Sequence, residues 1–325
     1  MEARRPICHG GSARPRCRAC TPSAGPLTQR PMPAVSVILP TRDRPALLAR
    51  ALSSVLRQTC RDLEVVLVDN NRASPPVRES VELSPLLTDP RVVVIKSVGA
   101  STAGAARNDG LAIARGEWIT YLDDDDEYEA GKVAAQLVLA RSTEAPLVLC
   151  GYTVVLPRRR RRRQTHVSEF RDDALLLDAN WGTPFLFHRH DPAARFDESL
   201  VAGEDTLLAQ SFLLRHDLRV VPNCAHSLVN VFPQIDGQRV HRDGEAIWRS
   251  FEVNAKLVGG RYSPAALRGY LAMGRLFRAQ FGHGNFAHFT GCAWDALASR
   301  GPGAWRLVAN ATARRTGLFK RWVVS

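Results

Sequence analysis

The chain has 325 residues, a hydrophobic content of 45% and a formal net charge of +12 at pH 7. This hydrophobic content supports a sizeable core and excludes disorder throughout, and no stretch approaches the roughly 20 uninterrupted apolar residues of a membrane span. The positive charge suggests a nucleic-acid partner, but residues 1–33 carry +5 and the run from Arg158 to Arg163 carries +6, so the remaining chain is nearly neutral.

Residues 1–33 are rich in Pro and Arg, and we expect a disordered extension there. Arginines stand in this segment without the apolar core of a signal peptide. The seven cysteines are an odd number, which fits a reducing compartment better than a disulfide framework. We therefore expect a cytoplasmic protein. Its basic segments would allow peripheral contact with the inner face of a membrane, at about 1 kcal/mol per basic residue near an anionic surface.

The folded part is expected to begin with a strand, a helix and a second strand. Val35 to Leu39 is a short run rich in β-branched residues, and Pro40 closes it. Asp43 can cap and Pro45 can open the helix that follows. Leu63 to Val68 then predicts the second strand. This order implies two parallel strands joined by a right-handed crossover.

The same alternation continues along the chain. Further strands are predicted at residues 91–96, 117–122, 147–155 and 181–187, and helices at 99–115, 129–141 and 203–215. Successive arginines cannot pack together, so residues 158–165 are predicted to be an exposed basic loop. The pattern beyond residue 243 is helical. We therefore predict an α/β fold with a Rossmann-like, mostly parallel sheet flanked by helices, followed by a helical C-terminal region.

Carboxylates follow several of the predicted strands. Asp43 and Asp69 come after the first two, and the acidic run from Asp123 to Asp126 comes after the strand at 117–122. Ligands of open α/β sheets bind beyond the carboxyl ends of the strands, where these acids should gather. Four adjacent carboxylates stay ionised only if they are solvated or neutralised by a cation. Mg²⁺ or Mn²⁺ would suit these oxygen ligands, and a solvated acidic turn is the alternative.

Other nucleotide and catalytic motifs do not fit. Gly99 to Gly104 has the glycine spacing of a P-loop, but Ala105 and Ala106 stand where Lys and Ser or Thr must hold phosphate and metal. No G-x-G-x-x-G follows the first strand, which argues against a dehydrogenase-type dinucleotide site. The sequence also lacks the G-x-S-x-G of serine hydrolases, and the acidic run lacks the glycine of a calcium loop.

Taken in order, the strand-end segments resemble the family-2 glycosyltransferases, which have the GT-A fold. The matching segments cover about residues 34–215 and are Val35 to Arg44, Val65 to Asn70, Gly104 to Leu111, Ala114 to Asp126 and Phe196 to Asp205. The resemblance implies a GT-A catalytic domain at residues 34–240, with residues 241–325 as a helical region packed on it. The arginine run and residues 1–33 lie outside the resemblance.

The resemblance also assigns roles to the acidic run. Asp123 and Asp125 match the first and third positions of the family's D-x-D motif, which contact the nucleotide ribose and ligate the metal. Asp125 and Asp123 are therefore the expected ligands of Mn²⁺ or Mg²⁺. Asp124 is expected to contribute to binding of the nucleotide. Such a metal would neutralise charge on the leaving nucleoside diphosphate.

A second group of residues would bind the nucleotide, again by resemblance. Pro40 and Thr41 fall in the family's nucleotide loop, and Asp43 lies close to it in sequence. Asp69 would hydrogen-bond the base or the ribose. Arg107 would approach the nucleotide or its diphosphate.

The expected catalytic base lies some eighty residues after the acidic run. Asp205 matches the acid on the acceptor side of the family's site and could take the proton of the acceptor hydroxyl, with Glu204 as the alternative. Without the family, an acidic pair before a helix is better explained by capping and the helix dipole. Residues 181–183 are expected either to line the acceptor side or to hold a buried Trp.

The resemblance thus implies a metal-dependent transferase that moves a sugar from a UDP-, GDP- or dTDP-sugar to an acceptor hydroxyl with inversion. The acceptor would be a glycan, a lipid-linked molecule or a small molecule, as in polysaccharide or glycoconjugate biosynthesis. The alternative is a catalytically inactive nucleotide-sugar-binding or membrane-recruited scaffold. No specific nucleic-acid partner is expected.

Overall fold

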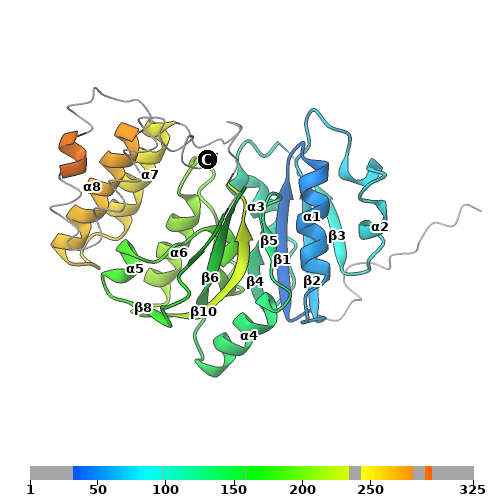
Figure 1. Cartoon of the computed structure of the whole chain (residues 1–325), viewed down its shortest axis with the longest axis horizontal. Helices are drawn as coiled ribbons and strands as arrows, with labels where there is room; N and C mark the ends of the chain where they lie inside the picture. Colours follow the sequence, from blue (N-terminus) through cyan, green and yellow to red (C-terminus); the bar gives the residue numbers. More distant parts are fainter. Residues whose placement is uncertain (1–31, 98, 158, 234–242, 281–289, 295–325) are drawn as a thin grey trace, which may run out of the picture. The chain divides into compact units, whose positions relative to one another are not determined.

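A computed structural model of the chain describes residues 32–97, 99–157, 159–233, 243–280 and 290–294 (Figure 1). Residues Pro33–Ser325 form one compact unit. The predicted extension at residues 1–33 therefore lies almost wholly outside the described residues. None of the helices in the described ranges is long and apolar enough to cross a bilayer.

The first half of the sheet is parallel, as predicted. Its strands lie in the order β3 (Val92–Lys96), β2 (Leu63–Asp69), β1 (Val35–Thr41) and β4 (Trp118–Tyr121). Every residue of β2 is buried, as expected for a parallel strand covered on both faces. Thr41 of β1 lies opposite Asp69 of β2, so both strands end at the same edge of the sheet. Helix α1 (Pro45–Leu56) buries Leu48 and Leu52, and α1 and α3 (Ala103–Leu111) both pack against β1.

The second half of the sheet mixes strand directions. Strand β9 (Phe187–Arg189) runs antiparallel to both β4 and β6 (Leu147–Leu156), and β10 (Val220–Val231) runs parallel to β6. The short β5 (Glu127–Tyr128) pairs with β10. The strand predicted at 181–187 is wrong over most of its length. Residues Thr183–Phe185 form the short helix η3, because Pro184 has no N–H to donate to a strand partner.

The predicted basic loop at residues 158–165 is also wrong. Residues Arg159–Arg163 form strand β7, which pairs antiparallel with β6. The backbone of β6 supplies hydrogen-bond partners whatever the side chains are, and successive arginines point to opposite faces of the ribbon. The like charges are thereby separated without a loop. A further short strand, β8 (Glu169–Arg171), pairs with β10.

The described chain contains further helices. They are η2 (Val77–Glu79), α2 (Ser84–Leu87), α4 (Lys132–Ser142), α5 (Ala174–Leu177), α6 (Glu204–Arg215), α7 (Gly244–Leu257) and α8 (Pro264–Gln280). Helix α7 packs against α6 and α8, and α8 also packs against α5 (Figure 1). Tyr262, between α7 and α8, donates a 2.6 Å hydrogen bond to the side chain of Gln210 on α6. The division into domains at residues 34–240 and 241–325 stays a prediction.

Candidate active site

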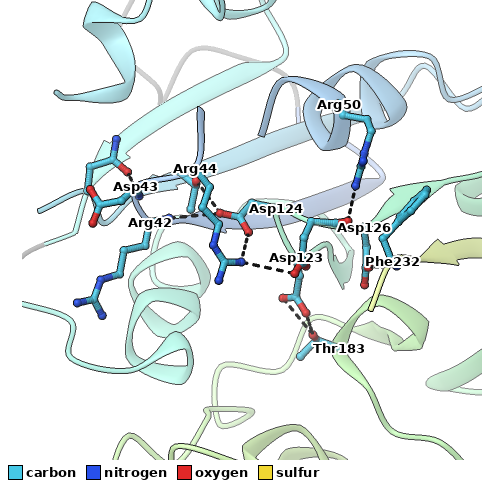
Figure 2. A network of polar contacts seen from close by, with 12 residues as sticks. Arg42, Asp43, Arg44, Arg50, Asp123, Asp124, Asp126, Thr183 and Phe232 are labelled. Atoms are coloured by element: carbon cyan, nitrogen blue, oxygen red, sulfur yellow. Dashed lines mark hydrogen bonds and ion pairs between the residues drawn. The ribbon is translucent and has the colours of Figure 1, made fainter. Parts of the chain in front are cut away.

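The acidic run lies where β4 ends, beside the end of β1. Leu122 is buried and donates its backbone N–H to Ile38 of β1 before the chain turns. Asp124 points back toward β1, where its Oδ2 accepts a 2.9 Å hydrogen bond from the Thr41 hydroxyl, and Arg44 lies 3.3 Å from its Oδ1 (Figure 2). Burial is the main cause that raises the pKa of Asp124 to about 6. Asp124 is therefore held by protein groups on the side where the nucleotide is predicted to bind.

Asp123 points toward the opposite side of the turn. Its side chain is 35% exposed and its Oδ1 accepts a 2.6 Å hydrogen bond from Nη2 of Arg107. The hydroxyl of Thr183 lies 3.4 Å from the other carboxylate oxygen (Figure 2). The second terminal nitrogen of Arg107 donates to Glu204 at 2.9 Å. One buried guanidinium on α3 thus joins the acidic run to the acidic pair that begins α6.

Asp205 shares this environment. Its Oδ1 accepts the backbone N–H of Thr206 at 2.6 Å. Burial and then the charge of Glu204 raise the pKa of Asp205 well above that of an ordinary carboxyl, while the charge of Arg107 opposes them. The charge of Asp205 also adds to the burial that raises the pKa of Tyr270 on α8. Glu204 is bonded directly to Arg107. Asp205 is therefore the member of the pair whose negative charge is less stabilised.

The sequence before α6 brings the acidic pair into place. Gly203 has a φ of +72°, a left-handed conformation that side chains rarely adopt. A Cβ atom at this position would lie 2.6 Å from the hydroxyl oxygen of Ser250 on α7. Glycine is therefore required both by the backbone and by the close approach of α7.

Asp43 orders a loop instead of capping α1. Its Oδ1 accepts three backbone hydrogen bonds, from Arg72, Ala73 and Ser74, at 2.7 to 3.0 Å. These donors lower the pKa of Asp43, the bond from Ser74 contributing most. Helix α1 is instead preceded by Arg44, which makes no side-chain capping bond. The capping role expected for Asp43 is wrong, because the neighbouring loop offers three N–H donors to the same oxygen.

Asp69 is buried at the end of β2 and is similarly engaged. Its two carboxylate oxygens accept the backbone N–H groups of Val77 and Asn71, each at 3.0 Å. A cavity of about 130 Å³ lies next to this loop, between the ends of β1 and β2 and the start of α1. Thr41 lines this cavity, whereas Pro40 lies inside β1, opposite Val68. Contacts of Pro40, Thr41, Asp43 and Asp69 with a nucleotide stay predictions.

Comparison with known proteins decides the family. Residues 36–200 match the sequence model of glycosyl transferase family 2 over half of the chain. The chain belongs to this family. Among related proteins, WcaA of Escherichia coli K12, whose name assigns it to colanic acid biosynthesis, is 36% identical over 105 residues. That alignment covers 32% of this chain and 37% of WcaA. A GalNAc(5)-diNAcBac-PP-undecaprenol β-1,3-glucosyltransferase of Campylobacter jejuni is 35% identical over 104 residues, covering 32% and 33% of the two chains.

The chain thus spans about a third of the length of these two family members. Solved structures support the fold over a longer range. TarS 1–349 of S. aureus in complex with UDP-GlcNAc superposes with a TM-score of 0.58 at 15% identity, covering 86% of this chain and 88% of that one. The mannosyltransferase PcManGT of Pyrobaculum calidifontis, in complex with GDP-Man and Mn²⁺, gives 0.52 at 17% identity, covering 91% and 87%. The predicted GT-A fold of this family-2 glycosyltransferase is confirmed.

The expected metal ligands of this family-2 chain offer hard oxygen donors. Within the described ranges, no group of three or more His, Cys, Asp or Glu side chains could hold a metal ion by itself. Mg²⁺, however, often binds through one or two carboxylates, with phosphate oxygens as the other ligands. The side chains of Asp123 and Asp125 are 35% and 18% exposed, and each lies next to a guanidinium group. This donor set fits a cation shared with a diphosphate, and the two ligands stay predictions.

The expected acceptor-side residues of the glycosyltransferase divide into two kinds. Trp181 is buried and its indole N–H donates to the backbone oxygen of Leu175 at 2.9 Å, so it supports the fold. Thr183 contacts Asp123 and belongs to the site. His188 is also structural, since burial lowers its pKa to about 4 and its ring is bonded to Tyr121.

Sequence reasoning missed four residues around the glycosyltransferase site. Arg44 contacts both Asp124 and Asp125, and Arg50 donates to the backbone oxygen of Asp125 at 2.6 Å. Phe232 stacks under the guanidinium of Arg50 at 4.1 Å, and Tyr270 lies near Asp205. All of these contacts join residues far apart in the chain. Only the position of Arg44 beside the nucleotide loop gave a signal in the sequence.

Proposed function

We propose that this protein transfers a sugar from a nucleotide-sugar donor to an acceptor hydroxyl, with a divalent metal and with inversion at the sugar carbon. The observation that carries the proposal is the double hydrogen bond of Arg107 to Asp123 and Glu204. Asp123 of the acidic run and Glu204 of the acidic pair are 81 positions apart in the sequence, and Arg107 links them in one site. A donor-side acid group and an acceptor-side acid group are what such a transfer needs.

The nucleotide would lie over the ends of β1 and β2. The cavity there is bordered by the loop that Asp43 and Asp69 order, and its lining includes the polar side chains of Thr41, Asn71 and Ser74. A UDP-, GDP- or dTDP-sugar is the proposed donor. Solved proteins of the same fold are described in complex with UDP-GlcNAc and with GDP-Man, which supports this class of ligand.

Asp125 and Asp123 would hold Mn²⁺ or Mg²⁺, which supplies Lewis-acid stabilisation of the charge that develops on the leaving diphosphate. Arg107 orients the Asp123 carboxylate through a 2.6 Å ion pair. Arg44 contacts the Asp124 carboxylate at the edge of β1. The protein thus fixes both sides of the acidic run before a ligand arrives.

Asp205 is the proposed base, and Glu204 serves to hold Arg107. As the acceptor oxygen attacks the anomeric carbon, its proton passes to Asp205, while the bond from that carbon to the diphosphate oxygen breaks. Attack from the face opposite the leaving group gives inversion. A raised pKa makes Asp205 a stronger proton acceptor than a solvated carboxylate.

The pH dependence of transfer should report this base. A carboxyl with a raised pKa is protonated, and so inactive as a base, up to a higher pH than an ordinary one. We expect kcat/KM to rise with pH through the raised pKa of Asp205 and then to level off. The measurement is kcat/KM in overlapping buffers at constant ionic strength. A rate that already levels off near the ordinary Asp pKa of about 4 would contradict the assignment.

The acceptor is proposed to be a glycan or a lipid-linked saccharide. A Campylobacter relative is named for an undecaprenol-diphosphate-linked acceptor, and WcaA is assigned to colanic acid biosynthesis. These names support polysaccharide or glycoconjugate biosynthesis as the setting. A small-molecule acceptor is the remaining alternative.

A panel of nucleoside diphosphates and nucleotide sugars, with and without Mn²⁺, tests donor binding. A ligand at about 100 times its Kd stabilises the folded state by about 2.7 kcal/mol, which corresponds to a rise in Tm of roughly 5 °C. We expect one base to give this rise only with Mn²⁺, and Asp125→Ala to remove it. The exposed Asp217 provides a matched control, since Asp217→Ala should keep the full shift. Absence of a shift with every nucleotide, together with absence of diphosphate release, would reject the proposed function.

A further inference from the structure

Strand β7 is the most concentrated charge in the described chain. Its five arginines pair in register with Tyr152 to Leu156 of β6. Arg160, Arg162 and Arg163 are exposed, whereas Arg159 and Arg161 are half-buried. The ordered ribbon holds these guanidinium groups at fixed spacing, roughly 3.4 Å of rise per residue. A loop would have let them spread apart.

The exposed charges of β7 are not neutralised by carboxylates in the described part of the chain. No ion pair there includes Arg160, Arg162 or Arg163, and the partner of Arg160 is the amide oxygen of Asn230 at 2.9 Å. Burial is the main cause that lowers the pKa of Arg161, and repulsion from the charges of Arg159 and Arg163 adds to it. An anionic partner would relieve this repulsion.

Apolar side chains lie directly beside these arginines. Val154, Val155 and Leu156 of β6 are half-exposed and pair with Arg161, Arg160 and Arg159. Side chains alternate between the two faces of the ribbon, so Val155 shares one face with Arg160 and Arg162, and Val154 and Leu156 share the other with Arg159, Arg161 and Arg163. Each face therefore mixes apolar and cationic side chains, which is the composition of a surface that binds at a membrane interface. A hairpin that binds single-stranded nucleic acid would instead need free aromatic rings. Tyr152, the hairpin's aromatic residue, is already stacked on Phe185 at 4.2 Å.

The hairpin adjoins the proposed active site. Asn230, the partner of Arg160, lies two residues before Phe232, whose backbone N–H donates to Asp126 at 3.0 Å (Figure 2). Strands β6 and β10 run parallel and both end at this edge (Figure 1). A binding partner in contact with the hairpin would therefore lie next to the acidic run.

We propose that the β6–β7 hairpin docks this protein on a bilayer surface rich in anionic phospholipid headgroups. The exposed guanidinium groups of β7 bind headgroup phosphates, and the apolar side chains of β6 that share their face of the ribbon contact the interface between headgroups and acyl chains. This contact goes beyond the proposed transfer, which needs no membrane for its chemistry. It places the site at the surface where an acceptor with a lipid anchor would be found.

Vesicle binding by the full chain tests the proposal. Vesicles of phosphatidylcholine alone are compared with vesicles containing roughly a third phosphatidylglycerol, by co-sedimentation over a range of salt concentrations. We expect binding to the anionic vesicles, weakened by salt, and little binding to the neutral ones. A triple variant with Arg160→Gln, Arg162→Gln and Arg163→Gln should bind the anionic vesicles about tenfold more weakly or worse. The corresponding triple Lys variant should keep most of the binding, since it keeps the charge.

A second triple variant is the matched control. Arg57→Gln, Arg78→Gln and Arg141→Gln remove the same charge from exposed positions elsewhere, and we expect near wild-type binding. Equal binding to neutral and anionic vesicles, or undiminished binding by the β7 Gln variant, would overturn the proposal. So would tighter binding to a single-stranded RNA oligonucleotide at the same salt. The nucleotide-induced rise in Tm should be unchanged in the β7 variant, which separates a failure of docking from a failure of the proposed transfer.

Discussion

Asp205→Asn is expected to abolish sugar transfer while donor binding persists. The amide has nearly the same shape as the carboxylate but cannot accept the acceptor's proton, so the rate should fall by roughly 10²- to 10⁴-fold. Asp205 does not line the cavity at the ends of β1 and β2, where we propose that the nucleotide binds, so the donor Kd should change little. Diphosphate release and product formation measure the first quantity, and calorimetric titration with the donor measures the second.

Two further variants make this experiment decisive. Asp217→Asn changes an exposed acid at the end of α6 and should leave turnover unchanged. Glu204→Gln should lower turnover through loss of its bond to Arg107, yet keep the rise of kcat/KM with pH, because Asp205 remains. If Asp205→Asn retained full turnover and Glu204→Gln lost the pH dependence, the base would be Glu204. If neither changed the rate, the proposed mechanism would be wrong.

Arg107→Met is expected to destabilise the fold as well as the site. The guanidinium is buried and bonded to two acids, and removing one member of a buried charge group typically costs about 3–5 kcal/mol. Glu204 and Asp205 would then remain close together without their cation. We expect the free energy of unfolding in urea to fall by this amount at neutral pH. An unchanged free energy of unfolding would mean that Arg107 is not the link between the two acid groups.

The pH dependence of the Arg107→Met defect has a definite sign. The charge of Arg107 lowers the pKa of Asp205, so without it the pKa of Asp205 in the folded state should lie further above the unfolded value, and the defect should shrink as pH falls. The double variant Arg107→Met with Glu204→Gln should recover part of the lost stability, since one buried charge is gone. Arg107→Lys should rescue little, because one ammonium group cannot bond both acids in the fork geometry.

Short sequence patterns predicted the strands and strand ends whose structure depends on neighbouring residues in the chain. The β-branched runs at Val35 and Leu63 became parallel buried strands, and the strand ends brought Thr41 and the acidic run to one edge. Parallel register follows from the strand–helix–strand order alone. The meeting of Asp123 with the Glu204–Asp205 pair was predicted by resemblance, since no local pattern links positions so far apart.

The errors have physical causes that a single sequence hides. Charge repulsion argued for a loop at Arg159–Arg163, but backbone pairing with β6 outweighs it in an exposed ribbon. Asp43 looked like a helix cap because it precedes Pro45, yet the loop at residues 72–74 offers it three donors. Arg44 and Arg50 could not be placed at the acidic run without tertiary structure.

The close approach of Ser250 to Gly203 couples the position of α7 to that of the acidic pair that begins α6. The family match ends at residue 200, before either position. Yet the glycine that aims the acidic pair tolerates no side chain while Ser250 stays where it is. A larger side chain in place of Ser250 is therefore expected to displace Gly203 and with it the acidic pair, whereas the loop that Asp43 and Asp69 order is held by hydrogen bonds of its own.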